Sequence, residues 1–341
     1  MKVLFIGSDV YGSNSRSMRD GIIRSGDEVV TVDSAKISNL TGWSFARINR
    51  KLLGGRPSRS AVERVMSDVE SAVESFRPDC VFAFKAINLP QARLHSLSVP
   101  LKVHYSADDV SNAQNVSTDY LEHESLWDAV ITTKSHNVPE LLARGVLNPL
   151  LVWSAYDPEL HFRYRDVEHF DFLSGFIGNY RPDREKTIDS LCTLYGELFY
   201  LAGPGWRRAR LGGLNFSPKV HPGVYGAMYS RAISRVSANL VLLNSDNRDQ
   251  HTCRSFEVPA AGGLFVGPRT EEHEKILEDG SEAFLYSTED ELFEILERLR
   301  VDVEWARRVR IDGYRRVVEG RNTYADRWSE IRDSLIGQRS K

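Results

Sequence analysis

Short runs of hydrophobic residues alternate with longer amphipathic segments in the first half of the chain. The runs cover residues 1–7, 27–33, 79–84, 100–106 and 128–133. Between the first two runs, residues 14–25 place Met18, Ile22 and Ile23 at helical spacing on one face. Strands that alternate with helices pair in parallel through right-handed crossovers. The pattern therefore predicts a Rossmann-like α/β domain.

The same alternation returns after an interruption. Residues 148–170 are rich in aromatic residues, His and Asp-Pro and have no sustained period, so we expect a hinge there. A helix is predicted over 224–236. The strand-like runs of this half are 171–178, 198–203, 238–244 and 262–267.

This organisation predicts two Rossmann-like domains, each with a parallel sheet. The expected domains are residues 1–155 and residues 156–320. The tail is helical and charged, and its last piece, residues 321–341, can return to pack on the first domain.

Composition narrows the class of protein. Of the 341 residues, 41% are hydrophobic and 27% are charged, enough apolar side chain for two cores. The net charge of −3 disfavours a uniformly basic protein, so no nucleic-acid partner is expected. Cys80, Cys192 and Cys253 form no CxxC pair, which argues against a zinc site or a disulfide framework. The first apolar run is too short for a signal peptide and no later run suits a bilayer, so a cytoplasmic protein is expected.

Ligands of parallel α/β sheets bind beyond the carboxyl ends of the strands. After the first run, Gly12 and Ser13 lie at the start of a helix, a place for an anionic group of a donor. The spacing is neither GxGxxG nor a Walker motif, so a glycine turn with a capped helix explains it equally well.

The loop around residues 104–112 carries other polar candidates. His104 is near a strand end, with Asp108 and Asp109 just beyond it. The two carboxylates can hold sugar hydroxyls or a cation, or Asp109 can cap a helix. A lone strand histidine is more often structural than catalytic.

In the second half, Gly178, Arg181 and Arg184 follow a strand and precede a helix. Glycine allows close approach of a ligand, and guanidinium groups suit a phosphate. The alternative is a solvated turn whose arginines pair with Asp183 and Glu185.

The segment HTCRSFEVPAAGGLFVG, residues 251–267, begins another helix. We expect a start near Thr252 or Ser255, because Pro259 suits only a first helical turn. Glu257 then lies at a helix N-terminus, which stabilises a carboxylate by about 0.3–1 kcal/mol without any ligand. That effect leaves Arg254 and Asp249 unexplained, so a binding cleft is the stronger interpretation.

The block RSFEVPAAGG, with Thr270 and residues 278–292 after it, resembles the carboxyl-terminal signature of CgeB-type glycosyltransferases, often named spore maturation proteins. These in turn resemble retaining family-4 glycosyltransferases of the GT-B fold. The resemblance extends through FIGNYRPDR, LAGPGW, HYSADD and GSDVYGSNS, and so over nearly the whole chain.

The resemblance implies two Rossmann-like domains facing across a cleft that closes about residues 150–170, with the acceptor mainly on the first and a nucleotide-sugar donor on the second. Glycosyl transfer would retain the anomeric configuration and need no cofactor and no essential metal. His104 and Glu257 would face each other over this cleft.

The resemblance also implies roles for single residues. Family-4 enzymes hold the donor with two glutamates separated by seven residues, the later one on the ribose and the earlier one on the sugar. Glu257 matches the later position, but the earlier one is Asp249, which departs from the pattern.

The cationic residues and the acceptor side are assigned by the same resemblance. Arg181, Arg184 and Arg254 would neutralise the diphosphate leaving group. His104 would lie near the anomeric carbon, and Asp108 or Asp109 would take the acceptor proton.

Two other functions suit the same architecture. A nucleotide-sugar 2-epimerase would use the donor site without an acceptor, and a non-catalytic nucleotide-sugar-binding protein would keep the fold without the chemistry. The sequence leaves open the donor base and sugar, the acceptor (a saccharide, lipid, protein or small metabolite) and the oligomeric state.

Overall fold

The computed structural model describes residues 1–37, 57–164, 170–211 and 220–339. The chain divides into two compact units. Unit 1 contains Met1–Trp153 and Tyr324–Lys341, and unit 2 contains Ser154–Thr323.

Unit 1 is built on a parallel sheet. Its strands are β1 (Lys2–Gly7), β2 (Glu28–Asp33), β3 (Cys80–Phe84), β4 (Leu101–Ser106), β5 (Ala129–Thr132) and β6 (Pro149–Leu151). They pair in the order β2-β1-β3-β4-β5-β6. Because β2 and β3 lie on opposite sides of β1, the strand order reverses between β1 and β3. In open parallel sheets such a switch point opens a ligand-binding crevice at the carboxyl ends of the strands.

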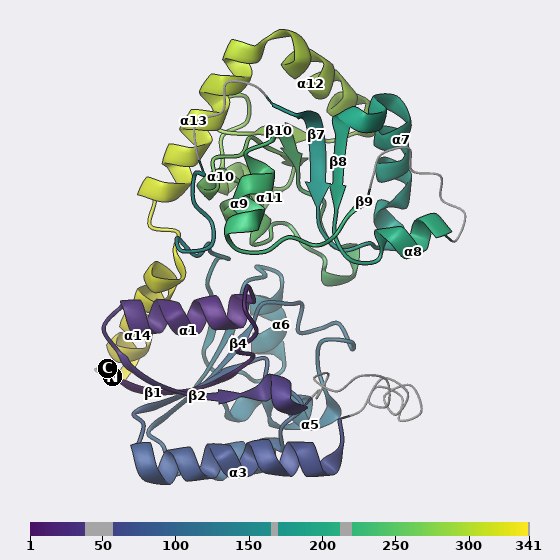
Figure 1. The fold of residues 1–341 in the computed structure, drawn as a ribbon. Helices are drawn as coiled ribbons and strands as arrows, with labels where there is room; N and C mark the ends of the chain where they lie inside the picture. The colour runs from purple at the N-terminus through teal and green to yellow at the C-terminus, as the bar shows by residue number, and fades with distance from the viewer. Residues whose placement is uncertain (38–56, 165–169, 212–219, 340–341) are drawn as a thin grey trace. The chain divides into compact units, whose positions relative to one another are not determined.

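Helices cover both faces of this sheet. They are α1 (Asn14–Arg24), η1 (Ser34–Ile37), α3 (Arg59–Phe76), α4 (Gln91–Ser96), α5 (Thr118–His123), η2 (Glu124–Leu126), α6 (Asn137–Ala143) and α14 (Tyr324–Arg339), where η denotes a 3₁₀ helix. Helices α1 and α14 lie side by side on one face, and α3 lies on the other (Figure 1). The side chains of each strand point alternately to the two faces of the sheet. On one face, Leu4 of β1 packs in the core that includes Val65 of α3. On the other, Phe82 of β3 contacts Trp328 of α14.

The C-terminal helix α14 is fixed to unit 1 by one buried carboxylate. Trp328 Nε1 donates to Asp27 at 2.6 Å, and Arg332 Nη1 donates to the same oxygen at 3.0 Å. The amino group of Met1 also pairs with Asp27. Gly21 of α1 is where the two helices approach, since a Cβ there would lie 2.7 Å from the backbone of Tyr324.

Unit 2 is built on a second parallel sheet. Its strands are β7 (Phe172–Ile177), β8 (Phe199–Ala202), β9 (Val220–His221), β10 (Val236–Leu240), β11 (Phe265–Pro268) and β12 (Phe284–Tyr286). They pair in the order β12-β11-β10-β7-β8-β9, so the strand order reverses between β7 and β10.

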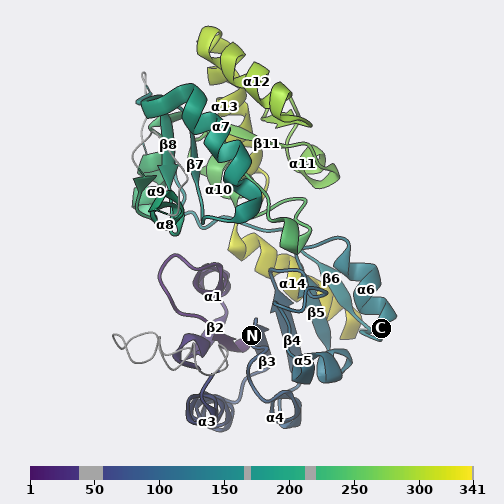
Figure 2. The same cartoon turned by 90° about the vertical axis from the view of Figure 1, so that its right-hand side faces the viewer.

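The helices of unit 2 pack around this sheet. They are η3 (Pro182–Arg184), α7 (Glu185–Tyr195), η4 (Gly196–Leu198), α8 (Trp206–Leu211), α9 (Ala227–Ile233), η5 (Ser245–Asn247), α10 (Arg254–Ala260), α11 (Glu271–Ile276), α12 (Glu289–Val301) and α13 (Val303–Glu319). The core joins Leu191 of α7 and Leu296 of α12 to Phe176 and Leu201 of the sheet. Helix α10 packs against α13, and α13 lies next to α12 in both views (Figures 1 and 2).

The α/β class predicted from the sequence is confirmed, since both sheets are parallel. Other details differ. Strand β10 ends at Leu240, so residues 241–244 of the predicted strand belong to its exit loop. Of the three residues predicted to share one helix face, Met18 and Ile22 are buried, whereas Ile23 is 50% exposed. The short strands β6, β9 and β12 were not predicted from the pattern.

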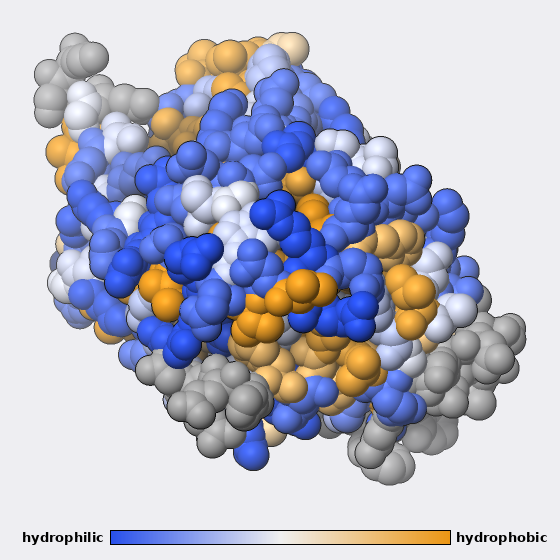
Figure 3. All heavy atoms as spheres, turned by 90° about the horizontal axis from the view of Figure 1, so that it is seen from above, coloured by the Kyte–Doolittle hydropathy of each residue, from blue (hydrophilic) through white to orange (hydrophobic). Residues whose placement is uncertain are grey.

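The exterior carries hydrophobic side chains among polar ones. On the face drawn in Figure 3, most residues are hydrophilic and the hydrophobic ones gather in a few groups between them. Within the described part of the chain, no helix has both the length and the apolar character to cross a membrane.

We expect the substitution Gly21→Ala to destabilise unit 1, because its Cβ would overlap the backbone of α14. Overpacking of this kind costs about 1–3 kcal/mol. The control Gly337→Ala also lies in a helix but meets no atom within 4 Å, so it should leave the stability unchanged or slightly raised. Urea unfolding of both variants measures the difference, and equal stabilities would contradict the α1–α14 packing.

Candidate functional site

Arg184 joins two strand exits at the switch point of unit 2. It lies in the loop after β7, and its Nη2 donates to the carbonyls of Leu242 at 3.0 Å and Leu243 at 3.3 Å, both after β10. Its Nη1 donates to the Asn179 carbonyl at 2.9 Å. Burial lowers the pKa of this guanidinium from its usual value. Arg184 therefore holds the carboxyl edge of the sheet together and places a positive charge there.

Arg181 links the same two loops through acidic residues. It forms an ion pair with Asp246 and lies 3.6 Å from Asp183. Asp183 in turn accepts a hydrogen bond from Ser245 Oγ at 2.6 Å. The predicted pairing of an arginine with Asp183 is present, whereas Glu185 accepts from the Tyr180 hydroxyl.

Gly178 follows β7 and packs closely against the exit of β8. A Cβ at Gly203, where φ is +142°, would lie 2.0 Å from the Gly178 carbonyl oxygen. The same oxygen accepts from Trp206 Nε1 at 2.8 Å. At Gly178 and Gly203, the segment after β7 therefore packs closely against the segment after β8.

Arg254 and Glu257 form an ion pair in the first turn of α10. Glu257 is only 3% exposed, and its other oxygen lies 3.6 Å from His161 Nε2. Burial alone would raise the pKa of Glu257, but Arg254 and His161 outweigh it and hold the pKa below its usual range. The carboxylate therefore stays charged inside unit 2.

Arg254 is the more exposed member of the ion pair. Its side chain is 35% exposed and lies over the ring of Tyr229, 4.5 Å from the centroid. Glu257 and Tyr229 hold it on its buried sides. The charge of Asp249 raises the pKa of Arg184 and the charge of Arg254 lowers it, so the three side chains lie close enough to interact electrostatically. Asp249 accepts from the Asn244 amide at 3.2 Å.

His161 and Tyr229 were missed by the sequence analysis. The Asp157 amide donates to His161 Nδ1 at 3.2 Å, so the proton of the neutral ring is on Nε2, facing Glu257. Burial lowers the pKa of His161, although Glu257 opposes this shift. His161 lies in the aperiodic segment predicted as a hinge, where no spacing connects it with Glu257.

Buried histidines anchor the N-terminal turn of α10. His273 Nδ1 donates to the Pro268 carbonyl at 2.7 Å, so its Nε2 accepts from Ser255 Oγ at 2.9 Å. Next to it, His251 Nδ1 lies 2.5 Å from Glu272, and its Nε2 accepts from the Ser154 amide at 3.1 Å. These bonds fix α10 to α11 and so fix the position of Arg254.

The expectation that Pro259 lies in a first helical turn is wrong. Helix α10 begins at Arg254, so Pro259 is its sixth residue. The missing N–H removes one i→i−4 bond, the one to the Ser255 carbonyl, and the helix ends one residue later at Ala260, before Gly262 with its φ of +75°. Gly263 allows close packing against α9, since a Cβ there would lie 2.5 Å from Ile233.

The remaining predicted residues lie in unit 1. Ser13 caps α1 by accepting from the Arg16 amide at 3.2 Å, and Gly12 before it has a φ of +78°. This is the glycine turn with a capped helix that the sequence left open as an alternative. A donor contact by Gly12 and Ser13 stays a prediction.

His104 is a core side chain of unit 1. It is 1% exposed, its Nδ1 lies 3.1 Å from the Tyr120 hydroxyl, and its ring packs against Trp127. Burial lowers the pKa of His104 to about 3, so the ring is neutral at pH 7. The structural alternative accounts for these surroundings, and we leave His104 out of the proposed site.

The adjacent acids Asp108 and Asp109 point to different partners. Asp109 is buried and accepts from Asn137 Nδ2 at 2.8 Å and from the Ser111 amide at 2.9 Å, which makes a local turn rather than the predicted helix cap. Asp108 is more exposed and pairs with Lys85. Of the two, Asp108 is the one available to a ligand.

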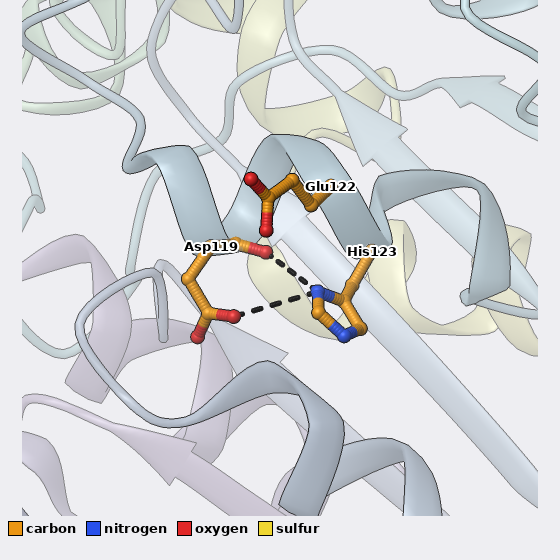
Figure 4. A group of neighbouring side chains, drawn as sticks. All are labelled: Asp119, Glu122 and His123. Carbon is orange, nitrogen blue, oxygen red and sulfur yellow. Dashed lines mark hydrogen bonds and ion pairs between the residues drawn. The ribbon is translucent and has the colours of Figure 1, made fainter.

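Asp119, Glu122 and His123 of α5 form a group with the composition of a metal site. However, His123 Nδ1, the ring atom nearest the carboxylates, donates to the Asp119 carbonyl at 2.9 Å (Figure 4). Asp119 also accepts from the Gln91 amide at 2.8 Å. These bonds give the group a structural explanation, and we assign no metal to it.

Residues 181–333 match a family model described as glycosyl transferase-like. HepE of Anabaena, solved with UDP-glucose, superposes with a TM-score of 0.66 at 14% identity, covering 99% of this chain and 100% of that one. The fold is that of the GT-B glycosyltransferases.

Two further GT-B structures are similar. An alpha-glucosyltransferase solved with UDP-glucose and DNA containing an abasic site has a TM-score of 0.68 at 14% identity, covering 98% of this chain and 99% of that one. Sucrose-phosphate synthase of Thermosynechococcus elongatus has a TM-score of 0.66 at 13% identity, covering 99% and 100%. A search of the curated proteins finds no significant sequence match. The family-model match begins at Arg181 and includes Arg184, Asp249, Arg254 and Glu257.

We expect unit 2 to lose stability in mild acid because His273 is buried as the neutral ring. Burial lowers its pKa to about 4, below the unfolded value near 6.5, so the unfolded chain binds the proton first as the pH falls. Stability should therefore decrease from about pH 6.5 toward pH 4, by up to about 1.4 kcal/mol per pH unit for this residue. Urea unfolding of the variant His273→Gln, which cannot titrate, should show a slope smaller by one proton, and an unchanged slope would contradict the assignment.

Proposed function

We propose that the protein is a glycosyltransferase of the CgeB type, which moves a sugar from a nucleoside-diphosphate sugar to an acceptor. The GT-B fold and the family-model match support the reaction class. The conclusion depends most on one observation: Arg254, whose side chain is 35% exposed, is held at the carboxyl edge of unit 2 by a buried carboxylate. This edge carries the β7–β10 switch point, where parallel α/β sheets bind their ligands.

The chemistry of transfer requires cations at the leaving group. The bond between the anomeric carbon and the diphosphate oxygen breaks, and a bond from the acceptor oxygen to the same carbon forms. Negative charge grows on the diphosphate during this step, so donors fixed beside it stabilise the transition state. Arg254 and Arg184 supply such charge, and Arg181 can contribute if a phosphate replaces Asp246 as its partner. With guanidinium groups in this role, the reaction proposed here uses no metal.

The proposal also covers the proton of the acceptor hydroxyl and the anomeric configuration of the product. The acceptor proton passes to the departing diphosphate, and the role of Asp108 as proton acceptor, which the resemblance implies, stays a prediction. A reaction in which the leaving group assists on the same face retains the anomeric configuration.

Glu257 and Asp249 have different roles in this proposal. Glu257 first of all orients Arg254, since both of its oxygens already face charged or polar partners. The resemblance adds a contact of Glu257 with the ribose and of Asp249 with the sugar, and both stay predictions.

We expect Arg254→Ala to weaken UDP binding about 10- to 100-fold, because a charge-assisted hydrogen bond contributes about 1.5–3 kcal/mol. The matched control is Arg235→Ala, which removes another half-exposed arginine of unit 2, paired with Asp171 before β7. Isothermal titration calorimetry with UDP should show normal affinity for this control.

Comparable UDP affinity in both variants would contradict the site. Incubation of the wild type with UDP-glucose alone, followed by NMR of the sugar, separates the function classes, because an epimerase would convert the donor without an acceptor.

A further inference from the structure

Unit 2 has a cavity at the amino edge of its sheet. Its volume is about 100 Å³. Three of the lining residues lie where strands begin: Phe170 precedes β7, Ser237 is the second residue of β10, and Gly262 precedes β11. These strands are neighbours in the order β11-β10-β7 and run parallel, so their first residues lie at the same edge.

The amino edge separates this cavity from the candidate donor residues. Arg184 and Arg254 lie in the segments that follow β7 and β10, at the opposite edge of the same sheet. A strand of five residues such as β10 spans about 16 Å, at about 3.3 Å per residue. A ligand in this cavity would therefore occupy a second site of unit 2.

One face of helix α13 contributes an apolar surface to the cavity. Its lining residues recur at positions i, i+3, i+4, i+7, i+8 and i+11, the spacing of a single helix face. They include Val303, Ala306, Arg307, Arg310, Ile311 and Tyr314. The valine, alanine and isoleucine form the apolar part, next to the aromatic ring of the tyrosine.

Two arginines of the lining stack on its aromatic rings. The guanidinium carbon of Arg310 lies 4.7 Å from the ring centroid of Phe170, and that of Arg163 lies 5.7 Å from the ring centroid of Tyr314. Arg310 Nε also donates to the Gly262 carbonyl. A Cβ at Gly262 would lie 2.9 Å from Arg163 Cγ, so the glycine lets that arginine approach. These contacts fix two guanidinium groups beside the apolar surface.

The charges of the described lining favour an anion. They are the three arginines Arg163, Arg307 and Arg310 against one acid, Glu304. Arg307 Nη1 lies 4.0 Å from Glu304, and the two side chains are 60% and 73% exposed. Water screens such a long, exposed pair, so it holds Arg307 only weakly. Arg307 can therefore turn to an anion at the rim of the cavity.

The size of the cavity and the arginines restrict the kind of anion. An apolar cavity of about 150 Å³ is known to hold one benzene molecule, so the smaller volume here admits a single ring and excludes a nucleotide. Guanidinium groups stack on flat aromatic faces and pair with both oxygens of a carboxylate. A flat ring with one carboxylate satisfies both the apolar surface and the charge.

We propose that this cavity binds a small aromatic carboxylate. The ring lies against the apolar face of α13, and the carboxylate pairs with Arg307 at the rim. The ligand binds reversibly, without a chemical step. This inference does not depend on the proposed function, because it uses none of the candidate donor residues.

The test uses the full chain with benzoate, whose affinity is measured by saturation-transfer NMR with titration. Benzamide has the same ring without the charge, and acetate has the charge without the ring. Benzoate should bind saturably and about tenfold or more tightly than either. Saturating UDP should not displace it, since the candidate donor residues lie at the opposite edge of the sheet.

Two matched pairs of variants locate the binding. Arg307→Met removes the guanidinium group at the rim, and Arg308→Met removes that of an exposed neighbour outside the lining. Val303→Glu adds a negative charge to the lining, and Val301→Glu adds one at another exposed valine outside it. Arg307→Met and Val303→Glu should each weaken benzoate binding about fivefold or more, and the two controls should bind like the wild type.

Each outcome decides the inference. Saturable binding of benzoate that only the two variants of the lining weaken would support it. Absence of saturable binding to the wild type, equal affinity for benzamide or acetate, or displacement of benzoate by UDP would overturn it. Equal benzoate affinity within either pair of variants would place the ligand elsewhere and overturn it as well.

Discussion

The candidate site depends on one ion pair, because a carboxylate buried as deeply as Glu257 needs a cation beside it to remain charged. Arg254 supplies that cation from the same helical turn, and His161 supports the other oxygen. The pair is asymmetric in exposure: the carboxylate side chain is 4% exposed and the arginine side chain is 35% exposed. The buried charge thus fixes the orientation of a cation that a diphosphate can contact.

The surrounding structure keeps this pair at the carboxyl edge of the sheet. Ser255 and His273 hold the first turn of α10, and Arg184 ties the exits of β7 and β10 to each other. Both arrangements use buried polar groups that form hydrogen bonds within unit 2, and such networks are costly to distort. A rigid edge suits a site that stabilises charge in a transition state, because its donors need no rearrangement during the reaction.

Much of the fold, and the segments that carry the candidate residues, could be predicted from the sequence. Parallel strands bury both faces, so their hydrophobic runs were visible. The segments after the strands, which carry Arg184 and Arg254, were chosen as candidate ligand sites from their position, and the roles of these residues stay predictions. Three-residue strands such as β12 are too short for any period to show. The link from His161 to Glu257 joins an aperiodic segment to a helix, and the burial of His104 depends on Tyr120 and Trp127, which only the folded chain brings to it. Pro259 was misplaced because this short helix tolerates the loss of one i→i−4 hydrogen bond near its end.

A crystal structure of the full chain with UDP bound tests the central claim most directly. The account predicts that the diphosphate lies beyond the exits of β7 and β10, with an oxygen about 2.7–2.9 Å from a guanidinium nitrogen of Arg254 while Glu257 still pairs with that arginine. A diphosphate bound elsewhere on the molecule, with Arg254 making no contact to it, would contradict the account.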